Sequence, residues 1–180
     1  MTDEKKPDEY IYKIIVIGDP MVGKTSLLMK FATSHFDERY IQTIGANITT
    51  KNILINGCII SMMVWDIAGQ EEFSEMRFSY FEGANGIIIV YDITRRETLD
   101  NVDNWYRQCL KHNIGHQPTI LVGNKNDKKS ERKVEKQEGL ELAKKMRCPF
   151  FETSALTGDC VENMFIKSAS EVHKLHWEGR

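Results

Sequence analysis

Residues 18–25 read Gly-Asp-Pro-Met-Val-Gly-Lys-Thr, a G-x-x-x-x-G-K-T pattern that decides how the chain folds. The apolar segment 12–17 (Tyr-Lys-Ile-Ile-Val-Ile) directly precedes them, and the helix-like segment 26–31 (Ser-Leu-Leu-Met-Lys-Phe) follows. A loop between a buried strand and a helix N-terminus points backbone N–H groups and the helix dipole at one anion. The context therefore predicts a phosphate-binding loop, and a strand–helix turn bounded by glycines is the alternative.

Two side chains of this loop carry the expected chemistry. Lys24 would reach the β- and γ-phosphates of a nucleoside triphosphate, and the Thr25 hydroxyl would ligate Mg²⁺. The sequence therefore predicts a protein that binds a nucleoside triphosphate with Mg²⁺. The residues of this segment expected to contact the nucleotide are Asp19, Pro20, Met21, Val22, Gly23, Lys24, Thr25 and Ser26.

A second motif indicates which base is bound. Asn-Lys-Asn-Asp at 124–127 follows the apolar run 119–123, Thr-Ile-Leu-Val-Gly. The Asp127 carboxylate can accept from both N1–H and the exocyclic amine of guanine, and adenine has no such donor pair. Asn124 can bond the base and tie the loop to its neighbours, while the Lys125 stem covers a base face. Alone these are ordinary turn residues, but behind a strand and a phosphate loop they predict guanine recognition.

A third motif, Trp-Asp-Ile-Ala-Gly-Gln-Glu at 65–71, follows the strand candidate 59–64. Asp66 would hold Mg²⁺ at the strand end through water. The Gly69 backbone N–H would contact the γ-phosphate, and Gln70 would orient the attacking water. This segment therefore supplies the expected hydrolytic residue.

Two further segments complete the expected site. Thr43, in Tyr-Ile-Gln-Thr-Ile-Gly at 40–45, would give Mg²⁺ a second hydroxyl, with Tyr40 beside the nucleotide. Glu-Thr-Ser-Ala-Leu at 152–156 follows another short strand and would place the Ala155 N–H against the guanine carbonyl. Its neighbours Ser154 and Leu156 would also line the base. The predicted catalytic residues are Gln70, Lys24 and Thr43, and the predicted metal ligands are Thr25, Thr43 and Asp66.

These motifs occur in the order and spacing of the Ras superfamily of small GTPases, which the chain resembles from about residue 10 to about residue 177. It is most similar to the Rab branch. The signs are Gly-Asp opening the phosphate loop, Ile-Gly at 44–45, Trp65 opening W-D-x-A-G-Q-E, Tyr-Phe-Glu-Gly-Ala at 80–84, and Tyr-Asp-Ile-Thr at 91–94. The resemblance implies a GTP/GDP switch with slow intrinsic hydrolysis. GTP would hold switch I (37–47) and switch II (68–80), and hydrolysis would release them.

The resemblance also implies protein partners: effectors, exchange factors and GTPase-activating proteins that bind the two switches. Ile48, Trp65 and Tyr80 match an effector-facing apolar cluster of Rab proteins, and a place in the core is their alternative reading. Phe36 falls where the family has an aromatic residue against the guanine base. A core residue that closes the first helix is an equally open interpretation of Phe36. A Rab-like role would lie in membrane traffic or signalling. The alternative function is a GTP-loaded interaction module that barely hydrolyses and cycles by exchange.

Three residues depart from the Rab-like pattern. Pro20 and Met21 stand where Ser and Gly are frequent; Pro removes one N–H donor and fixes φ. Slower or altered hydrolysis is one hypothesis, and a loop that tolerates variation is the other. Leu156 replaces a Lys, so the base cover there becomes apolar, and we expect retained guanine specificity with faster release.

The pattern of elements predicts an α/β fold: a single P-loop domain at 10–177, between a flexible segment 1–9 and a short end 178–180. We expect a six-stranded, mostly parallel sheet with helices on both faces. Asn-Gly at 56–57 predicts a hairpin and therefore one antiparallel pair. The expected strands are 11–17, 48–55, 59–66, 86–92, 119–122 and 150–153, and the expected helices are 24–33, 73–81, 97–112, 135–146 and 161–176.

Composition sets limits on the remaining function classes. A net charge of −2 in 180 residues argues against nucleic acid as the main ligand. The four cysteines have no C-x-x-C spacing, which suits reduced thiols in the cytoplasm. There is no signal peptide or transmembrane run. With no cysteine after Cys160 and Thr2 after the first Met, we expect no lipid anchor in this sequence. Peripheral membrane association would then require partners or a lipidated tail that this sequence lacks.

Overall fold

The strands form one six-stranded sheet in the order β2-β3-β1-β4-β5-β6. This computed structural model describes residues 7–33, 46–70 and 78–178. The strands are β1 (Glu9–Ile17), β2 (Ala46–Ile55), β3 (Cys58–Ile67), β4 (Gly86–Asp92), β5 (Thr119–Asn124) and β6 (Phe150–Thr153). All neighbouring pairs are parallel except β2 and β3, which are antiparallel. The expected α/β sheet with one antiparallel pair is confirmed.

The position of each strand in the sheet follows from its residues. Every residue of β4 is buried, as expected for a central strand covered on both faces. β2 lies at one edge of the sheet and has exposed residues along most of its length. The turn that joins β2 to β3 has Asn56 at φ 50° and Gly57 at φ 80°. Positive φ at both positions is the type I′ geometry that Asn-Gly favours, so the predicted hairpin is confirmed.

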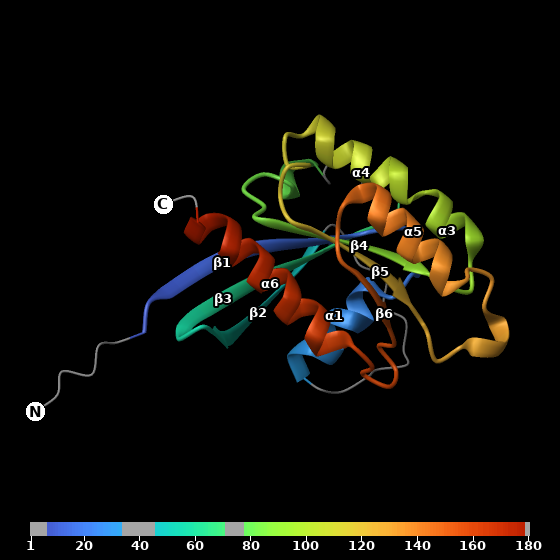
Figure 1. The fold of residues 1–180 in the computed structure, drawn as a ribbon, viewed down its shortest axis with the longest axis horizontal. Coiled ribbons are helices and arrows are strands. Elements are labelled where there is room, and N and C mark those ends of the chain that lie inside the picture. The colour runs from blue at the N-terminus through green and yellow to red at the C-terminus, as the bar shows by residue number, and fades with distance from the viewer. Residues whose placement is uncertain (1–6, 34–45, 71–77, 179–180) are drawn as a thin grey trace, which may run out of the picture.

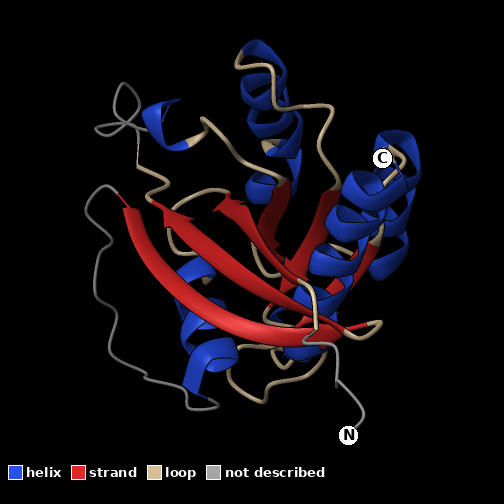
Figure 2. Cartoon of the chain, turned by 90° about the vertical axis from the view of Figure 1, so that its left-hand side faces the viewer, coloured by secondary structure: helices blue, strands red, loops and turns tan. Residues whose placement is uncertain are grey.

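Helices cover both faces of the sheet. α1 (Lys24–Thr33) and α6 (Val161–Glu178) lie on one face, and α3 (Arg96–Asp100), α4 (Val102–Lys111) and α5 (Lys136–Met146) lie on the other (Figures 1 and 2). Each layer has its own apolar core. Phe31 of α1 stacks on Phe165 of α6 with ring centroids 4.2 Å apart, while Trp105 of α4 and Ala143 of α5 are buried on the opposite face.

Two helix predictions need correction. The expected helix 97–112 is two helices, α3 and α4, which meet at Asn101. The Asn101 side chain donates to the Asp19 carboxylate at 2.6 Å. The residue between the two helices therefore bonds the loop that follows β1. Of the expected helix 73–81, residues 73–77 lie outside the described residues, and Phe78–Tyr80 form a 3-10 helix, η2.

Several element ends also differ from the expected bounds by one or two residues. β1 begins at Glu9, which already pairs with Ile59, and α6 continues to Glu178. α5 starts one residue later than expected because the Glu138 carboxylate accepts from the Glu135 N–H at 2.9 Å, a cap that ends the preceding turn. These shifts leave the sheet order unchanged.

The sheet topology determines where the motifs meet. β3, β1, β4, β5 and β6 are all parallel, so their carboxyl ends share one edge of the sheet. The loops that leave these ends carry the phosphate motif, the Trp-Asp motif and both predicted guanine segments. Open α/β sheets bind ligands at this edge.

Candidate nucleotide-binding site

The loop 18–25 joins β1 to α1 and lies close to two neighbouring strands. Gly18 has φ 141°, and a Cβ there would come within 2.2 Å of the Val90 carbonyl oxygen. Gly23 has φ 98°, and a Cβ there would come within 2.4 Å of the Asn124 amide nitrogen. Both glycines of the motif are therefore required for space as well as for backbone conformation.

Lys24 lies inside the loop. Its side chain is only 7% exposed, and Nζ donates to the carbonyl oxygens of Gly18 at 2.7 Å and Asp19 at 2.9 Å. The loop thus wraps around an ammonium group at the N-terminus of α1. A buried cation beside converging backbone groups suits an anion of the size of a phosphate.

The predicted metal ligands that the structure describes lie together. The Thr25 hydroxyl donates to the carboxylate of Asp66, which is fully buried near the end of β3. A hydroxyl and a carboxylate are oxygen ligands of the kind Mg²⁺ takes alongside phosphate oxygens and water. The residues present therefore fit a magnesium ion. Thr43, the third predicted ligand, lies outside the described residues.

The predicted guanine loop is bonded directly to the phosphate loop. Asn124, 2% exposed, donates from Nδ2 to the Val22 carbonyl at 2.9 Å and accepts at Oδ1 from the Thr153 hydroxyl at 3.1 Å. Lys125 donates from Nζ to the Met21 carbonyl at 2.9 Å. Asn124 therefore has the loop-tying role expected of it, and the two motifs form one unit.

The 154–156 segment lies against the same loop. The Ser154 hydroxyl donates to the carboxylate of Asp127, which holds the predicted base-reading group in place. Asn126 Nδ2 donates to Asp159 at 2.6 Å, a second link between the two segments. Ala155 is 5% exposed and Leu156 is 47% exposed. The residues predicted to bind guanine that the structure describes are therefore brought together at the carboxyl ends of β5 and β6.

Asp19 is fixed by residues that the sequence analysis did not single out. Its carboxylate accepts from Asn101 Nδ2 at 2.6 Å and from Trp105 Nε1 at 2.7 Å. Arg95 Nη2 donates to the Pro20 carbonyl at 2.7 Å. The sequence did indicate that Arg95 lies near the site, because Arg95 follows the end of β4 at the edge of the sheet where the motifs meet. The other two contacts depend on how the α3–α4 layer packs.

The Trp-Asp motif also reaches the phosphate loop. A Cβ on Gly69 would come within 2.5 Å of the Gly18 carbonyl oxygen and 2.8 Å of Pro20 N, so this glycine lies directly against the loop. Gln70 follows it and is half-buried. Phe36, Tyr40 and Thr43, with residues 37–45 of switch I and 71–77 of switch II, lie outside the described residues.

The three residues of the expected effector cluster lie side by side. Ile48 of β2 pairs with Trp65 of β3 in the antiparallel register, and the Trp65 ring lies 6.0 Å from the Tyr80 ring. Ile48 is 46% exposed, while Trp65 and Tyr80 are half-buried. Lys13 Nζ lies 4.1 Å from the Trp65 ring centroid, a cation–π contact. Apolar and basic groups from β1, β2, β3 and η2 thus lie together here.

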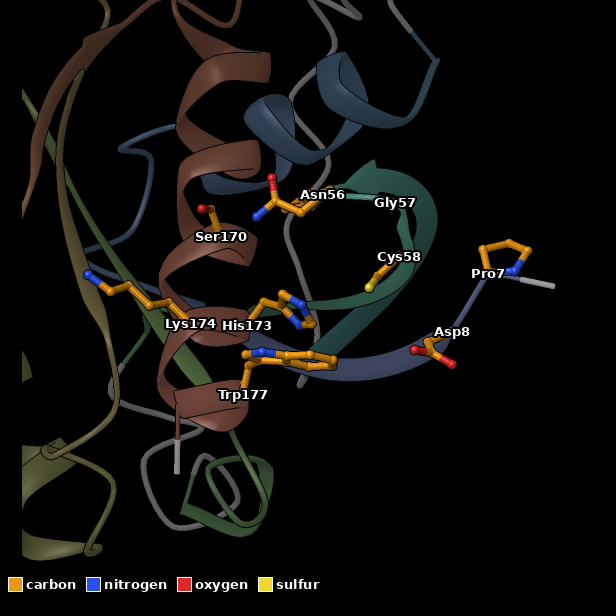
Figure 3. A pocket seen from close by; sticks show the side chains of 10 residues that line it. Pro7, Asp8, Asn56, Gly57, Cys58, Ser170, His173, Lys174 and Trp177 are labelled. Atoms are coloured by element: carbon orange, nitrogen blue, oxygen red, sulfur yellow. The ribbon is translucent and has the colours of Figure 1, made fainter. Parts of the chain in front are cut away.

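A pocket of about 630 Å³ lies elsewhere, between the carboxyl-terminal half of α6 and the β2–β3 turn (Figure 3). His173 and Trp177 project from α6 toward the side of the β2–β3 turn, where Asn56 and Cys58 lie. The Tyr12 hydroxyl and His173 Nδ1 are hydrogen-bonded at 3.0 Å, so one wall is fixed by the core. None of the phosphate or guanine motif residues lines this pocket, which is therefore separate from the site above.

The comparisons with known proteins agree with this geometry. Residues 13–174 match the model of the Ras family. Ras-related protein SEC4 of Candida albicans, in strains WO-1 and SC5314, is 38% identical over 170 residues, which are 94% of this chain and 81% of the relative. None of the helices within the described ranges has the length and apolar character needed to cross a membrane. By sequence match, by fold and by the loops at the sheet edge, the chain belongs to the Ras family of small GTPases, which bind GTP and GDP with Mg²⁺ and hydrolyse GTP.

Proposed function

We propose that this chain is a GTP/GDP switch with slow intrinsic hydrolysis, in which the loop 18–25 binds the phosphates and the segments 124–127 and 154–156 bind guanine. One observation carries the proposal: Asn124 donates to the Val22 carbonyl, so the base-reading loop and the phosphate loop are a single bonded unit. A change on the phosphate side is thereby linked to the groups that hold the base.

The proposed chemistry assigns a role to each group. Lys24 neutralises charge on the β- and γ-phosphates, and Asp127 selects guanine through its donor pair. Thr25, Thr43 and Asp66 hold Mg²⁺, which supplies further charge neutralisation on the phosphate oxygens. Gln70 orients the attacking water. Its neighbour Gly69 lies against the loop, which supports this assignment.

The turnover without partners is proposed to be slow. An arginine supplied by an activating protein is worth about 10³–10⁵ in rate in this reaction class. Pro20 borders the position where such an arginine would enter. Replacing Pro20 with Gly tests whether this residue alters hydrolysis: unchanged intrinsic and stimulated rates would show a loop that tolerates variation.

The proposed partners bind the switches in the GTP state. The surface of Ile48, Trp65 and Tyr80 supports an effector site because its apolar groups are contiguous and partly exposed. The proposed role is Rab-like, in membrane traffic or signalling on the cytoplasmic side of membranes. The Rab-like motifs and the similarity to a Ras-related protein support it. To test this surface, binding of a partner to the GTP-loaded chain is compared with binding to Ile48→Asp. We expect the variant to lose the partner.

The switch itself is tested by loading the purified chain with GTP and Mg²⁺ and following the bound nucleotide over time. Gln70→Leu is the matched variant, because it keeps an aliphatic side chain at this position and removes the amide group that orients water. We expect slow conversion to GDP in the unmodified chain and retained GTP in the variant. Equal retention in both would favour the interaction module that cycles by exchange, and tighter binding of ATP than GTP would contradict the guanine assignment.

A further inference from the structure

Three consecutive carbonyl groups of the phosphate loop are each held by a side chain from the opposite loops. Pro20 O accepts from Arg95 Nη2 at 2.7 Å, Met21 O from Lys125 Nζ at 2.9 Å, and Val22 O from Asn124 Nδ2 at 2.9 Å. The donors follow or end β4 and β5, two neighbouring strands of the sheet. Side-chain hydrogen bonds therefore hold the loop along one side.

These three hydrogen bonds determine where the N–H groups of the loop point. A trans peptide is planar, so its carbonyl and the N–H of the next residue point in opposite directions. Holding the carbonyls of residues 20, 21 and 22 outward directs the N–H groups of Met21, Val22 and Gly23 to the other side of the loop. Successive N–H groups on one side form an anion-binding concavity. Because Pro20 has no N–H of its own, the Met21 N–H is the first donor of this series.

A single buried carboxylate holds two of the three donors. Asp92, whose side chain is 1% exposed, lies 2.6 Å from Lys125 Nζ and 3.3 Å from Arg95 Nε. Thr94 adds hydrogen bonds from its N–H and its hydroxyl. Burial alone would raise the pKa of Asp92, but the hydrogen bonds from Lys125 and Thr94 outweigh it and hold the pKa below its ordinary value. The carboxylate is thus charged and fixes both cations.

Lys125 and Asn124 belong to the guanine motif, whereas Arg95 belongs to none of the motifs. We propose that Arg95 is a positioning residue of the phosphate loop: through the Pro20 carbonyl it orients the Met21 N–H toward the phosphate side. It also stabilises Met21 at φ 63°, a conformation that L side chains rarely adopt. This inference rests on the proposed nucleotide site at residues 18–25. It assigns a determinant of diphosphate affinity that lies outside the loop and outside the guanine motif.

The test separates binding of the β-phosphate from binding of the rest of the nucleotide. Affinities for GDP and GMP are measured by competition against a fluorescent GDP, with Mg²⁺ present. Arg95→Met removes the guanidinium and keeps the apolar stem, Arg95→Ala removes both, and Arg95→Lys retains a cationic donor. Arg96→Met is the matched control, because Arg96 is the neighbouring arginine but pairs with Asp100 and Glu138 of the helical layer.

We expect Arg95→Met and Arg95→Ala to bind GDP about tenfold more weakly, because the Met21 N–H is no longer held toward the phosphate and about one hydrogen bond to a charged group is lost. Affinity for GMP, which lacks the β-phosphate that the loop N–H groups face, should not change. Arg95→Lys should recover part of the loss, and Arg96→Met should match the unmodified chain. If Arg95→Ala fails to fold, Arg95→Met still decides the question.

Unchanged GDP affinity in Arg95→Met would overturn the inference. Equal losses for GDP and GMP would also overturn it, because a general loosening of the fold lowers both affinities together. A different result would contradict the proposed function itself: the unmodified chain would show no preference for GDP over GMP, or Lys24→Ala would keep full GDP affinity. The two failures are therefore distinguishable.

Discussion

At the scale of single residues, Met21 combines a left-handed backbone with an exposed side chain. Its φ is 63° and its side chain is 59% exposed, so little packing holds it there. A left-handed conformation costs an L-residue about 1–2 kcal/mol, and glycine avoids this cost but loses about 0.4–1 kcal/mol through its freer unfolded chain. We therefore expect Met21→Gly to raise the free energy of unfolding by about 0.5–1 kcal/mol in urea titrations.

Met21→Ala is the control for this prediction, because it removes the same exposed chain but keeps the Cβ that causes the strain. It should leave the free energy of unfolding unchanged. Both variants are compared at two GDP concentrations, since a gain that grows with GDP comes from binding and not from relief of strain. Equal effects of Gly and Ala would show that the side chain, and not the backbone, matters at this position.

Asp92 is a buried residue whose charge state links stability to pH. Its folded pKa is lowered from 3.8, so its contribution is fully present above that value and is lost as the pH falls through the folded pKa. We expect the free energy of unfolding to fall, as the pH drops below about 4, more steeply in the unmodified chain than in Asp92→Asn. Parallel curves from urea titrations would contradict the role of this carboxylate. The variant should also be less stable at neutral pH, because Lys125 and Arg95 lose their buried counter-charge.

At the scale of elements, the loops after β5 and β6 act as one unit because a side-chain bond joins them. Asn126 Nδ2 donates to Asp159 at 2.6 Å, and the Asn126 N–H donates to the Thr153 carbonyl. Removing the side-chain bond should let the 154–156 segment move away from the base. We expect Asn126→Ala to release GDP several times faster than the unmodified chain in stopped-flow exchange. Asp159→Ala should have the same effect, and the double variant should be no faster than either single one.

A sequence predicts an element well when the interactions that determine it join residues close together in the chain. The phosphate loop and the β2–β3 hairpin were predictable because contiguous residues determine them, as Asn56 and Gly57 do by adopting positive φ. The break between α3 and α4 at Asn101 was not predictable, because the bond from Asn101 to Asp19 joins residues 82 positions apart. Arg95 was missed for the same reason, since its contact with the loop exists only once β4 lies beside β1.

At the scale of the whole molecule, the binding site depends on every layer. The phosphate loop contacts groups from β3, β4 and β5, and Asp19 is bonded to Asn101 and to Trp105 of α4. A nucleotide that binds only this assembled state should therefore stabilise all of it, by about 2.7 kcal/mol at a concentration of 100 times its Kd. Cysteine labelling offers a way to measure this effect.

Cys109 is a buried residue of α4, and burial raises the pKa of its thiol to about 12. Its reaction with iodoacetamide at about pH 8 requires a thiolate exposed by opening of the fold. We expect saturating GDP and Mg²⁺ to slow labelling of Cys109 about a hundredfold, as the stabilisation at 100 times Kd implies. Cys58, half-buried at the β2–β3 turn, should react from the folded state and keep its rate. If GDP left Cys109 labelling unchanged while it bound tightly, the core around α4 would open without releasing the nucleotide. The bonds from Asn101 and Trp105 to Asp19 would then not couple this layer to the site.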